Sequence, residues 1–292
     1  MKNFKYIFFF VLGFSFTSCT ETITLELEDP EPVLVVDGHI TNYDTAQYVK
    51  LSSLDNYFAE QPPNYSIYKN ATVALIEDSV NVGNFAFNSN NQRFEIQYQG
   101  KIGSFYQIDI VLPDGSGYLS AAEKMEEPIP IDTIWYEVAE ADGINNEESD
   151  IIVFMNTQEP SGTGDNYQWK SYVNNIYNFL AQDLFFADDR IVDGQYVEEF
   201  EVYVFSKEEY DEAKNSSPTS QVVVKIEQTK ISSRYLKYIS LVSQQILQVG
   251  SPFAAPPAEI RGNVYKKGEN EVLALGYFYS SSVSTAQIEI VE

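Results

Sequence analysis

The sequence predicts a mainly β protein. We expect an N-terminal immunoglobulin-like antiparallel β-sandwich over residues 33–127 and a second β-rich domain over residues 131–292 that carries one or two helices. Short apolar runs are separated by Gly, Pro, Asn and Asp, which is typical of strands and turns. Apolar and polar side chains alternate through residues 105–112, as in a strand with one buried face. Helical spacing is strongest over residues 232–249, and a length of 292 residues favours two domains.

Residues 1–18 have the pattern of a secretory signal peptide that ends at Cys19. Lys2 and Lys5 form a basic start, and residues 7–16 form an apolar stretch too short for the ~20 residues of a spanning helix. Cys19 is the only cysteine, and its position directly after Thr17 and Ser18 is similar to a bacterial lipobox. That similarity implies cleavage before Cys19 and its acylation, which would anchor the protein stably. The alternative is an ordinary cleaved signal and a free thiol.

Residues 19–32 are expected to form an acidic tether. Self-repulsion between its acidic residues, together with Pro30 and Pro32, favours an extended segment. It also resembles the surface-export signals of Bacteroidota lipoproteins, and the alternative is a solvated linker without a sorting role. The formal net charge of −25 excludes nucleic-acid binding and repels anionic lipid headgroups. Membrane affinity is therefore expected to come from the acyl chains.

The first domain is predicted to contain six strands, over residues 33–36, 48–54, 71–77, 93–98, 105–112 and 118–122. Residues 55–70 interrupt them with a loop that is longer than most, and such loops are often functional. We predict that its aromatic residues form part of a partner-binding surface: Tyr57, Phe58, Tyr65 and Tyr68. The alternative is that these residues fold back as a small apolar cluster.

The second domain is predicted to begin after a linker at residues 128–130, since a proline pair does not fit a central strand. Five predicted strands cover residues 131–138, 151–156, 167–173, 199–205 and 222–226, and residues 277–279 are expected to form a further short strand of the core. Ser206 is expected to cap a helix over residues 207–215, and Ser232 or Ser233 a longer one near 232–249. The apolar face of the longer helix is expected to pack in the core: Tyr235, Tyr238, Ile239, Val242 and Ile246.

The residues needed for common enzyme chemistries are scarce. His39 is the only histidine, and its place in an early strand favours a packed side chain over a catalytic base. Once Cys19 is acylated, zinc sites built on His and Cys are excluded, and no Gly-rich phosphate loop occurs. The 43 acidic residues single out no pair for glycoside hydrolysis. We therefore expect no enzymatic activity and no cofactor except calcium.

Two short patterns predict small sites on the surface. Four acidic residues close in sequence can supply oxygen ligands for calcium, and the alternative is a solvated acidic turn: Asp183, Asp188, Asp189 and Asp193. Three Asp-Ser/Thr-apolar triplets match an O-glycosylation pattern, although so short a pattern also arises by chance. Its acceptors are Thr45, Ser79 and Thr133.

Several motifs extend across the chain after the tether. Pro256-Pro257-Ala258, Ile260 and Gly262-Asn263 precede Leu275-Gly276-Tyr277-Phe278, and earlier motifs occur at residues 34–38, 112–115 and 128–134. Together they resemble a Bacteroidota family of uncharacterised outer-membrane lipoproteins. Members of that family are often encoded beside TonB-dependent receptors with carboxypeptidase-regulatory-like plug domains. The resemblance implies an outer-membrane location near such a receptor and brings no catalytic residues.

The functional prediction is a lipid-anchored, surface-exposed accessory protein of the outer membrane, associated with a TonB-dependent receptor. The first alternative is a capture protein for glycans or peptides that uses aromatic residues in a cleft between the domains. A hydrolase is the third hypothesis. The sequence does not identify the ligand, the receptor, the oligomeric state or the face of the membrane that the body occupies.

Overall fold

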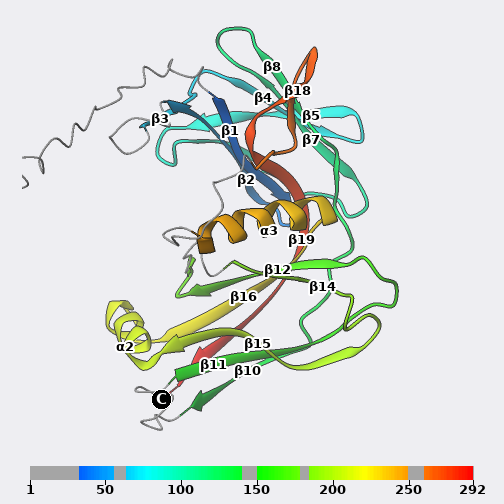
Figure 1. The fold of residues 1–292 in the computed structure, drawn as a ribbon. Coiled ribbons are helices and arrows are strands. Elements are labelled where there is room, and N and C mark those ends of the chain that lie inside the picture. The colour runs from blue at the N-terminus through cyan, green and yellow to red at the C-terminus, as the bar shows by residue number, and fades with distance from the viewer. Residues whose placement is uncertain (1–32, 56–63, 140–149, 178–183, 249–259, 292) are drawn as a thin grey trace, which may run out of the picture. The chain divides into compact units, whose positions relative to one another are not determined.

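The computed structural model describes residues 33–55, 64–139, 150–177, 184–248 and 260–291. The prediction of a mainly β protein with two helices is confirmed for this part of the chain, which holds nineteen strands. Residues Pro32–Glu292 form one compact unit, and most of the strands belong to one long, curled sheet (Figure 1).

The strands of the N-terminal part follow each other closely in sequence: β1 Val33–Thr41, β2 Thr45–Asp55, β3 Asn64–Ile67, β4 Thr72–Glu77, β5 Val80–Asn88, β6 Arg93–Tyr98, β7 Phe105–Val111, β8 Gly117–Ser120 and β9 Glu123–Lys124. All six strands predicted here are present. The sequence did not predict β5, a strand in which most side chains are half-buried or exposed, so that the apolar alternation is weak.

The remaining strands are more widely spaced: β10 Thr133–Ala139, β11 Asp150–Gln158, β12 Asn166–Val173, β13 Ile176–Tyr177, β14 Phe185–Asp188, β15 Tyr196–Ser206, β16 Val222–Lys230, β17 Val264–Lys266, β18 Glu269–Leu273 and β19 Leu275–Ile290. All five strands predicted for this region are present. The main addition is the length of β19, which has 16 residues, whereas the sequence indicated only a short strand around Tyr277.

Both predicted helices are confirmed. The first, α2, spans Lys207–Ser216, and Ser206 caps it in a full capping box with Glu209. The second, α3, spans Ser233–Gln248, and the Ser232 hydroxyl accepts a hydrogen bond from the Tyr235 amide at 3.1 Å. Of the apolar face predicted for α3, Tyr235 and Ile239 are buried and Tyr238 packs beside them.

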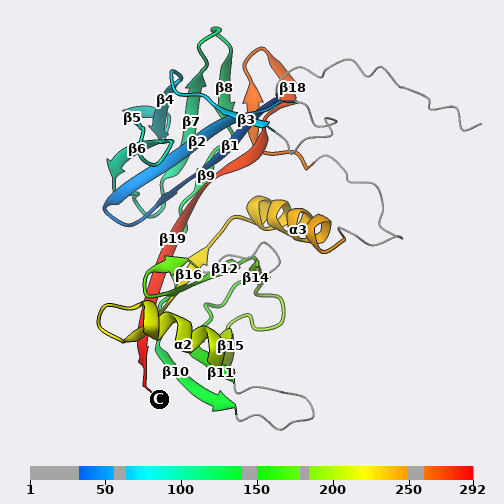
Figure 2. The same cartoon turned by 90° about the vertical axis from the view of Figure 1, so that its left-hand side faces the viewer.

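Strand β19 joins two groups of strands within the sheet, β13-β12-β16 on one side and the strands from β1 onward on the other. Its first half pairs in parallel with β1, and its second half pairs antiparallel with β16. The order of neighbours is therefore β13-β12-β16-β19-β1-β2-β6, and the views in Figures 1 and 2 show β19 passing along both groups of strands. The parallel β1–β19 pair differs from the purely antiparallel pairing that the sequence suggested, because β19 comes from the far end of the chain.

Three apolar cores hold these elements together. The first includes Leu51, Ile108 and Phe278, so the C-terminal strand completes the core of the N-terminal strands. The second lies between the β12–β16 region and the separate three-stranded sheet β10-β11-β15. The third packs α3 onto Tyr277 and Tyr279 of β19. The expected linker is well packed too, since Ile129 is buried in the second core.

The two family motifs near the C-terminus meet in a closely packed polar arrangement, which we call the Glu123 network. The buried Glu123 carboxylate accepts hydrogen bonds from the Tyr277 hydroxyl at 2.8 Å and the Asn263 amide at 3.3 Å. Asn263 also bonds both backbone groups of Phe278. Gly276 has φ +79°, and a Cβ there would lie 2.0 Å from the carbonyl oxygen of Val36. These motifs therefore serve the architecture of the fold.

Candidate functional site

A groove of about 480 Å³ crosses six neighbouring strands, β13, β12, β16, β19, β1 and β2. We call it the tyrosine groove, and it brings together residues from both ends of the chain. Its lining consists of His39, Thr41, Tyr43, Thr45, Tyr48, Lys170, Tyr172, Tyr177, Lys225, Glu227, Thr229, Ser281, Val283 and Thr285.

The alternation of side chains along each strand explains why these residues face the groove. On β16, Lys225 and Glu227 line it, whereas Val224 and Ile226, which alternate with them, are buried in the second core. On β19, Ser281, Val283 and Thr285 share the same face. Register completes the arrangement, because Glu227 lies opposite both Lys170 on β12 and Thr285 on β19. The groove is therefore one face of a continuous sheet.

Aromatic rings form much of the wall. The rings of Tyr172 and Tyr177 lie 5.2 Å apart between centroids, and the Lys225 ammonium group lies 3.8 Å from the centroid of Tyr172. On the other side, the Arg93 guanidinium lies 4.4 Å from the centroid of Tyr48. A tyrosine combines a broad apolar face with a hydroxyl. These walls can therefore stack against a ligand and form hydrogen bonds with it.

The two lysines of the groove differ in their contacts. Lys225 Nζ pairs with Glu227 Oε1 at 2.8 Å, and the Tyr172 hydroxyl donates to Glu227 Oε2 at 2.8 Å. Burial and this bond to Glu227 raise the pKa of Tyr172, so its hydroxyl remains a donor at neutral pH. Lys170 Nζ makes a single hydrogen bond of 3.3 Å, to the Tyr279 hydroxyl. Within the part of the chain that the structure describes, Lys170 has no ion pair.

His39 packs between aromatic rings, as its place in an early strand suggested. Its ring lies 5.1 Å from that of Tyr48 and 5.2 Å from that of Tyr279, between centroids. Burial, followed by the positive charges of Lys170 and Arg93, lowers the pKa of His39 to about 3. The imidazole is therefore neutral and too weak a base to accept a proton at neutral pH. This environment favours a packing role.

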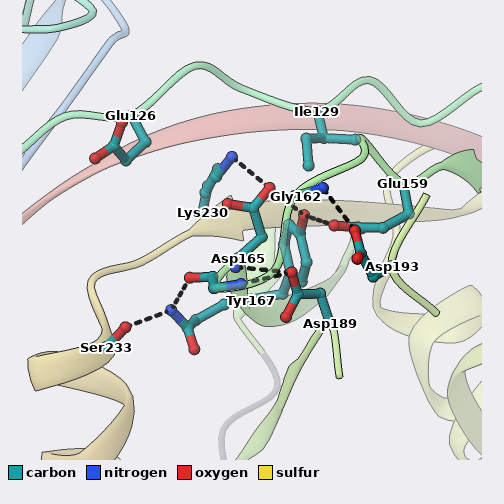
Figure 3. Close-up of polar contacts among 12 residues, drawn as sticks. Glu126, Ile129, Glu159, Gly162, Asp165, Tyr167, Asp189, Asp193, Lys230 and Ser233 are labelled. Atoms are coloured by element: carbon teal, nitrogen blue, oxygen red, sulfur yellow. Dashed lines mark hydrogen bonds and ion pairs between the residues drawn. The ribbon is translucent and has the colours of Figure 1, made fainter. Parts of the chain in front are cut away.

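A second polar site surrounds Tyr167 of β12 and Lys230 of β16, and Figure 3 shows its contacts. Alternation along the two strands places these side chains on the face opposite to Tyr172 and Lys225 of the groove. We call it the carboxylate cluster, and it consists of Glu159, Asp165, Tyr167, Asp189 and Lys230. The Tyr167 hydroxyl donates to Glu159 Oε1 at 2.8 Å, and Lys230 Nζ pairs with Asp165 Oδ2 at 2.8 Å. Asp189 Oδ2 accepts from the backbone amides of Gly164 and Asp165, at 2.8 and 3.0 Å. Glu159 is 3% exposed and Asp189 1% exposed.

These contacts hold loops in place. Asp189 ties the segment after β14 to residues 164 and 165, and Asp193 Oδ1 accepts from the Gly162 amide at 2.7 Å. Burial raises the pKa of Glu159 in spite of the hydrogen bond from Tyr167. Asp189 Oδ1 is buried without a hydrogen-bond partner among the described residues. The other contacts of the carboxylates come from the cluster's own residues and from backbone amides, and we therefore interpret the cluster as structural.

The acidic residues predicted to bind calcium have separate partners. Asp188 pairs with Arg190, at 2.8 Å, whereas Asp189 and Asp193 accept from different loop amides. Asp183 lies outside the described residues. Across the described ranges, no three His, Cys, Asp or Glu side chains gather closely enough to hold a metal ion. Calcium binding stays a prediction.

The residues predicted for partner binding are only partly covered by the structure. Tyr57 and Phe58 lie outside the described ranges, as does Cys19, the predicted lipidation site. Tyr65 is part of β3 and pairs through its backbone with Leu54. Tyr68 is half-buried, packs on the first core and donates its amide to the Leu51 carbonyl at 3.1 Å. Tyr68 thus folds back against the body, and partner binding by this loop stays a prediction.

The three proposed O-glycosylation acceptors are exposed. Thr45 begins β2 at the rim of the tyrosine groove, Ser79 lies in the turn before β5, and Thr133 begins β10. Their modification stays a prediction.

The alternative function of ligand capture assumed aromatic residues in a cleft between the two domains and named none of them; that assumption stays a prediction. Tyr48, Lys170 and Tyr172 were recognised as parts of strands but not as neighbours. A signal was available in β16, where Lys225, Glu227 and Thr229 alternate with buried residues and so mark a polar face. What the sequence lacked was the pairing of β19 with β1, which places the strands side by side.

Comparisons with known proteins give a family and nothing more specific. A search of curated proteins found no match. In the described part of the chain, no helix combines the length and the apolar character needed to cross a bilayer. Residues 20–287 match the family described as a domain of unknown function, DUF4249. Because that match covers most of the 292 residues, the chain belongs to the DUF4249 family.

Proposed function

We propose that this protein is a lipid-anchored binding protein that captures a ligand, a glycan or a peptide, in the tyrosine groove. The observation that carries this proposal is the gathering of Tyr43, Tyr48, Tyr172 and Tyr177 around one groove with charged and hydroxyl groups. Its volume of about 480 Å³ falls in the usual range of ligand sites, roughly 300–1,000 Å³. Ring faces supply stacking area, and the polar groups supply orientation.

Binding without turnover is the activity that we propose. Among the described residues that line the groove, Glu227 is the only carboxylate, and both of its oxygens are engaged by Lys225 and Tyr172. Hydrolysis of a glycoside ordinarily requires two carboxyl groups on opposite sides of the scissile bond. The neutral His39 has no role as a base at physiological pH.

Replacement of a rim tyrosine tests the groove. Tyr177 is 38% exposed, so Tyr177→Ala should leave the fold intact and weaken the binding of any glycan-array or peptide-array ligand by roughly fivefold to tenfold. Tyr196→Ala, on the exposed start of β15, is the matched control. Equal binding by both variants and the unchanged protein would show that the ligand does not contact the groove.

We further propose that Cys19 is acylated, that the protein is anchored in the outer membrane and exposed at the cell surface, and that it accompanies a TonB-dependent receptor. The signal-like pattern of residues 1–18 and the resemblance to Bacteroidota lipoproteins support this location. A body on an acidic tether could present a captured ligand to such a receptor.

The location has its own test. The Cys19→Ser variant should leave the membrane fraction, while the unchanged protein should co-purify from native membranes with an outer-membrane receptor in mild detergent. Sedimentation of Cys19→Ser with membranes would contradict the anchor. Co-purification without any outer-membrane protein would contradict the receptor partnership alone.

We also propose that residues 33–127 are a variant of the immunoglobulin-like sandwich; strands β17 and β19 of the C-terminal region pair with it and share its core, within one compact unit. Antiparallel pairing of β1 with β2 and of β4 with β7, around one shared core, supports the sandwich. Strand β19, the last strand in the sequence, would then add to the sandwich beside β1.

A further inference from the structure

Lys170 is the least compensated charge of the tyrosine groove. It is half-buried on β12, and its ammonium group has one long hydrogen bond, to the Tyr279 hydroxyl at 3.3 Å. The carboxylate directly opposite, Glu227, is already bound by Lys225 and Tyr172. A chain with a formal net charge of −25 has an excess of carboxylates, yet none of the described ones forms an ion pair with Lys170, and Asp37 interacts with its charge only at longer range. The groove thus offers a cation to its ligand.

A second polar group in the groove is also available. The Ser281 hydroxyl is buried in the wall and has no hydrogen-bond partner among the described residues. Ser281 follows Tyr279 by two positions on β19, so both residues face the same side of the strand. Buried hydroxyls are normally paired. Ser281 and Lys170 therefore indicate a polar ligand that brings acceptors, at least one of them negatively charged.

The topology favours a sugar over a peptide. Of the strands beneath the groove, β12, β16, β1 and β2 lie inside the sheet, and β19 pairs with β1 over its first half and with β16 over its second half. An extended peptide is commonly recognised when it adds to a free strand edge, and the end strand among the described groove strands, β13, is only two residues long. Recognition must therefore come from side chains, and tyrosine rings with hydroxyls fit the faces and hydroxyl groups of a sugar ring.

We propose that the tyrosine groove binds an acidic glycan that contains uronate residues. A sugar ring stacks on the tyrosines, and its carboxylate accepts a hydrogen bond from Lys170 Nζ. This inference rests on the proposed capture function and names the ligand class. Lys225 has a different role, because its ion pair with Glu227 and its cation–π contact with the Tyr172 ring fix the shape of the wall.

Calorimetric titration with charged and neutral probes tests the proposal. The probes are trigalacturonate, trimannuronate and the fully methyl-esterified, neutral form of each. We expect at least one free acid to bind, its ester to bind roughly 10- to 100-fold more weakly, and Lys170→Met to bind the acid as weakly as the unchanged protein binds the ester. The control Lys124→Met removes an exposed lysine that pairs with Glu126, and it should bind the acid unchanged.

The outcomes separate this inference from the capture function. Equal affinity of the unchanged protein for acid and ester overturns the acidic-ligand inference and leaves glycan capture standing. That comparison needs no variant, so it decides even if Lys170→Met fails to fold. Tighter binding of triglutamate than of either uronate shows a peptide ligand instead. If neither these probes nor neutral glycans and peptides bind, both proposals are wrong.

Discussion

The tyrosine groove and the carboxylate cluster occupy opposite faces of the same pair of strands and use the same kinds of residue. On one face, Tyr167 and Lys230 lie opposite each other in register; on the other, Tyr172 lies opposite Lys225. Both sites combine tyrosine, lysine and carboxylate. In the carboxylate cluster, Lys230 pairs with Asp165 at 2.8 Å, with its side chain 12% exposed. In the groove, Lys170 has no carboxylate partner among the described residues.

This comparison shows that composition alone does not mark a binding site. Polar groups that satisfy one another at the edge of a core stabilise the fold, because leaving any one of them unpaired costs free energy. Polar groups that the sheet holds in place without a protein partner can bond water in the free protein and a ligand in the complex. If this distinction is correct, substitutions in the carboxylate cluster should reduce stability, and matched substitutions in the groove should reduce binding.

The largest difference is expected between the two lysines. Lys230→Met removes the cation beside Asp165, near Glu159 and Asp189, and should lower the free energy of unfolding by about 2 kcal/mol, since the pair is only partly exposed. Lys170→Met should change it by no more than about 0.5 kcal/mol. Urea unfolding of both variants at pH 7 measures the difference. Equal losses would mean that Lys170 supports the fold as much as Lys230 does.

A smaller difference is expected between two tyrosine hydroxyls. Tyr167→Phe removes the 2.8 Å hydrogen bond to Glu159, which is buried, and should cost about 1–2 kcal/mol. Tyr172→Phe removes a bond of the same length to Glu227, but that carboxylate retains Lys225, and we expect a cost below about 1 kcal/mol. Thermal unfolding compares them. A larger loss for Tyr172→Phe would contradict the division between the two faces.

Local sequence patterns predicted the strands and both helices well. Ser206 and Glu209 form a capping box that can be seen in the sequence, and the alternation in β7 marks its buried face. These features depend on residues close to one another in the chain. Strand β5 was missed because its sequence carries few buried apolar residues, so that the local pattern of a strand is weak there.

The candidate site could not be predicted in the same way, because it depends on pairing between distant segments. His39 lies opposite both Tyr48 and Tyr279, and the second pairing joins residues 240 positions apart. Nothing in the local pattern of residues 275–290 indicates that they neighbour β1. The motif residues Asn263 and Gly276 serve the architecture of the fold through such distant contacts, with Phe278 and Val36.

The smallest predicted effect concerns pH and the buried Glu159. Its folded-state pKa is raised above 4.5, mainly by burial, so the folded state holds this proton more tightly than the unfolded chain. The resulting stabilisation is complete below pH 4.5 and is lost as the pH rises through the raised pKa. Above that raised pKa, the ionised carboxylate is therefore a cost, which the hydrogen bond from Tyr167 offsets in part.

Glu159→Gln removes that cost while keeping an acceptor for the Tyr167 hydroxyl. The variant should be more stable than the unchanged protein at pH 7, by about 1 kcal/mol or less, and the advantage should shrink as the pH falls toward 4.5. Chemical unfolding at several pH values measures the difference between the two proteins, so that other titrating groups cancel. Ligand binding in the groove should not change with this substitution. A variant less stable at pH 7 would show that the charge of Glu159 holds the cluster together, and that the cluster depends on ion pairing more than on hydrogen bonds.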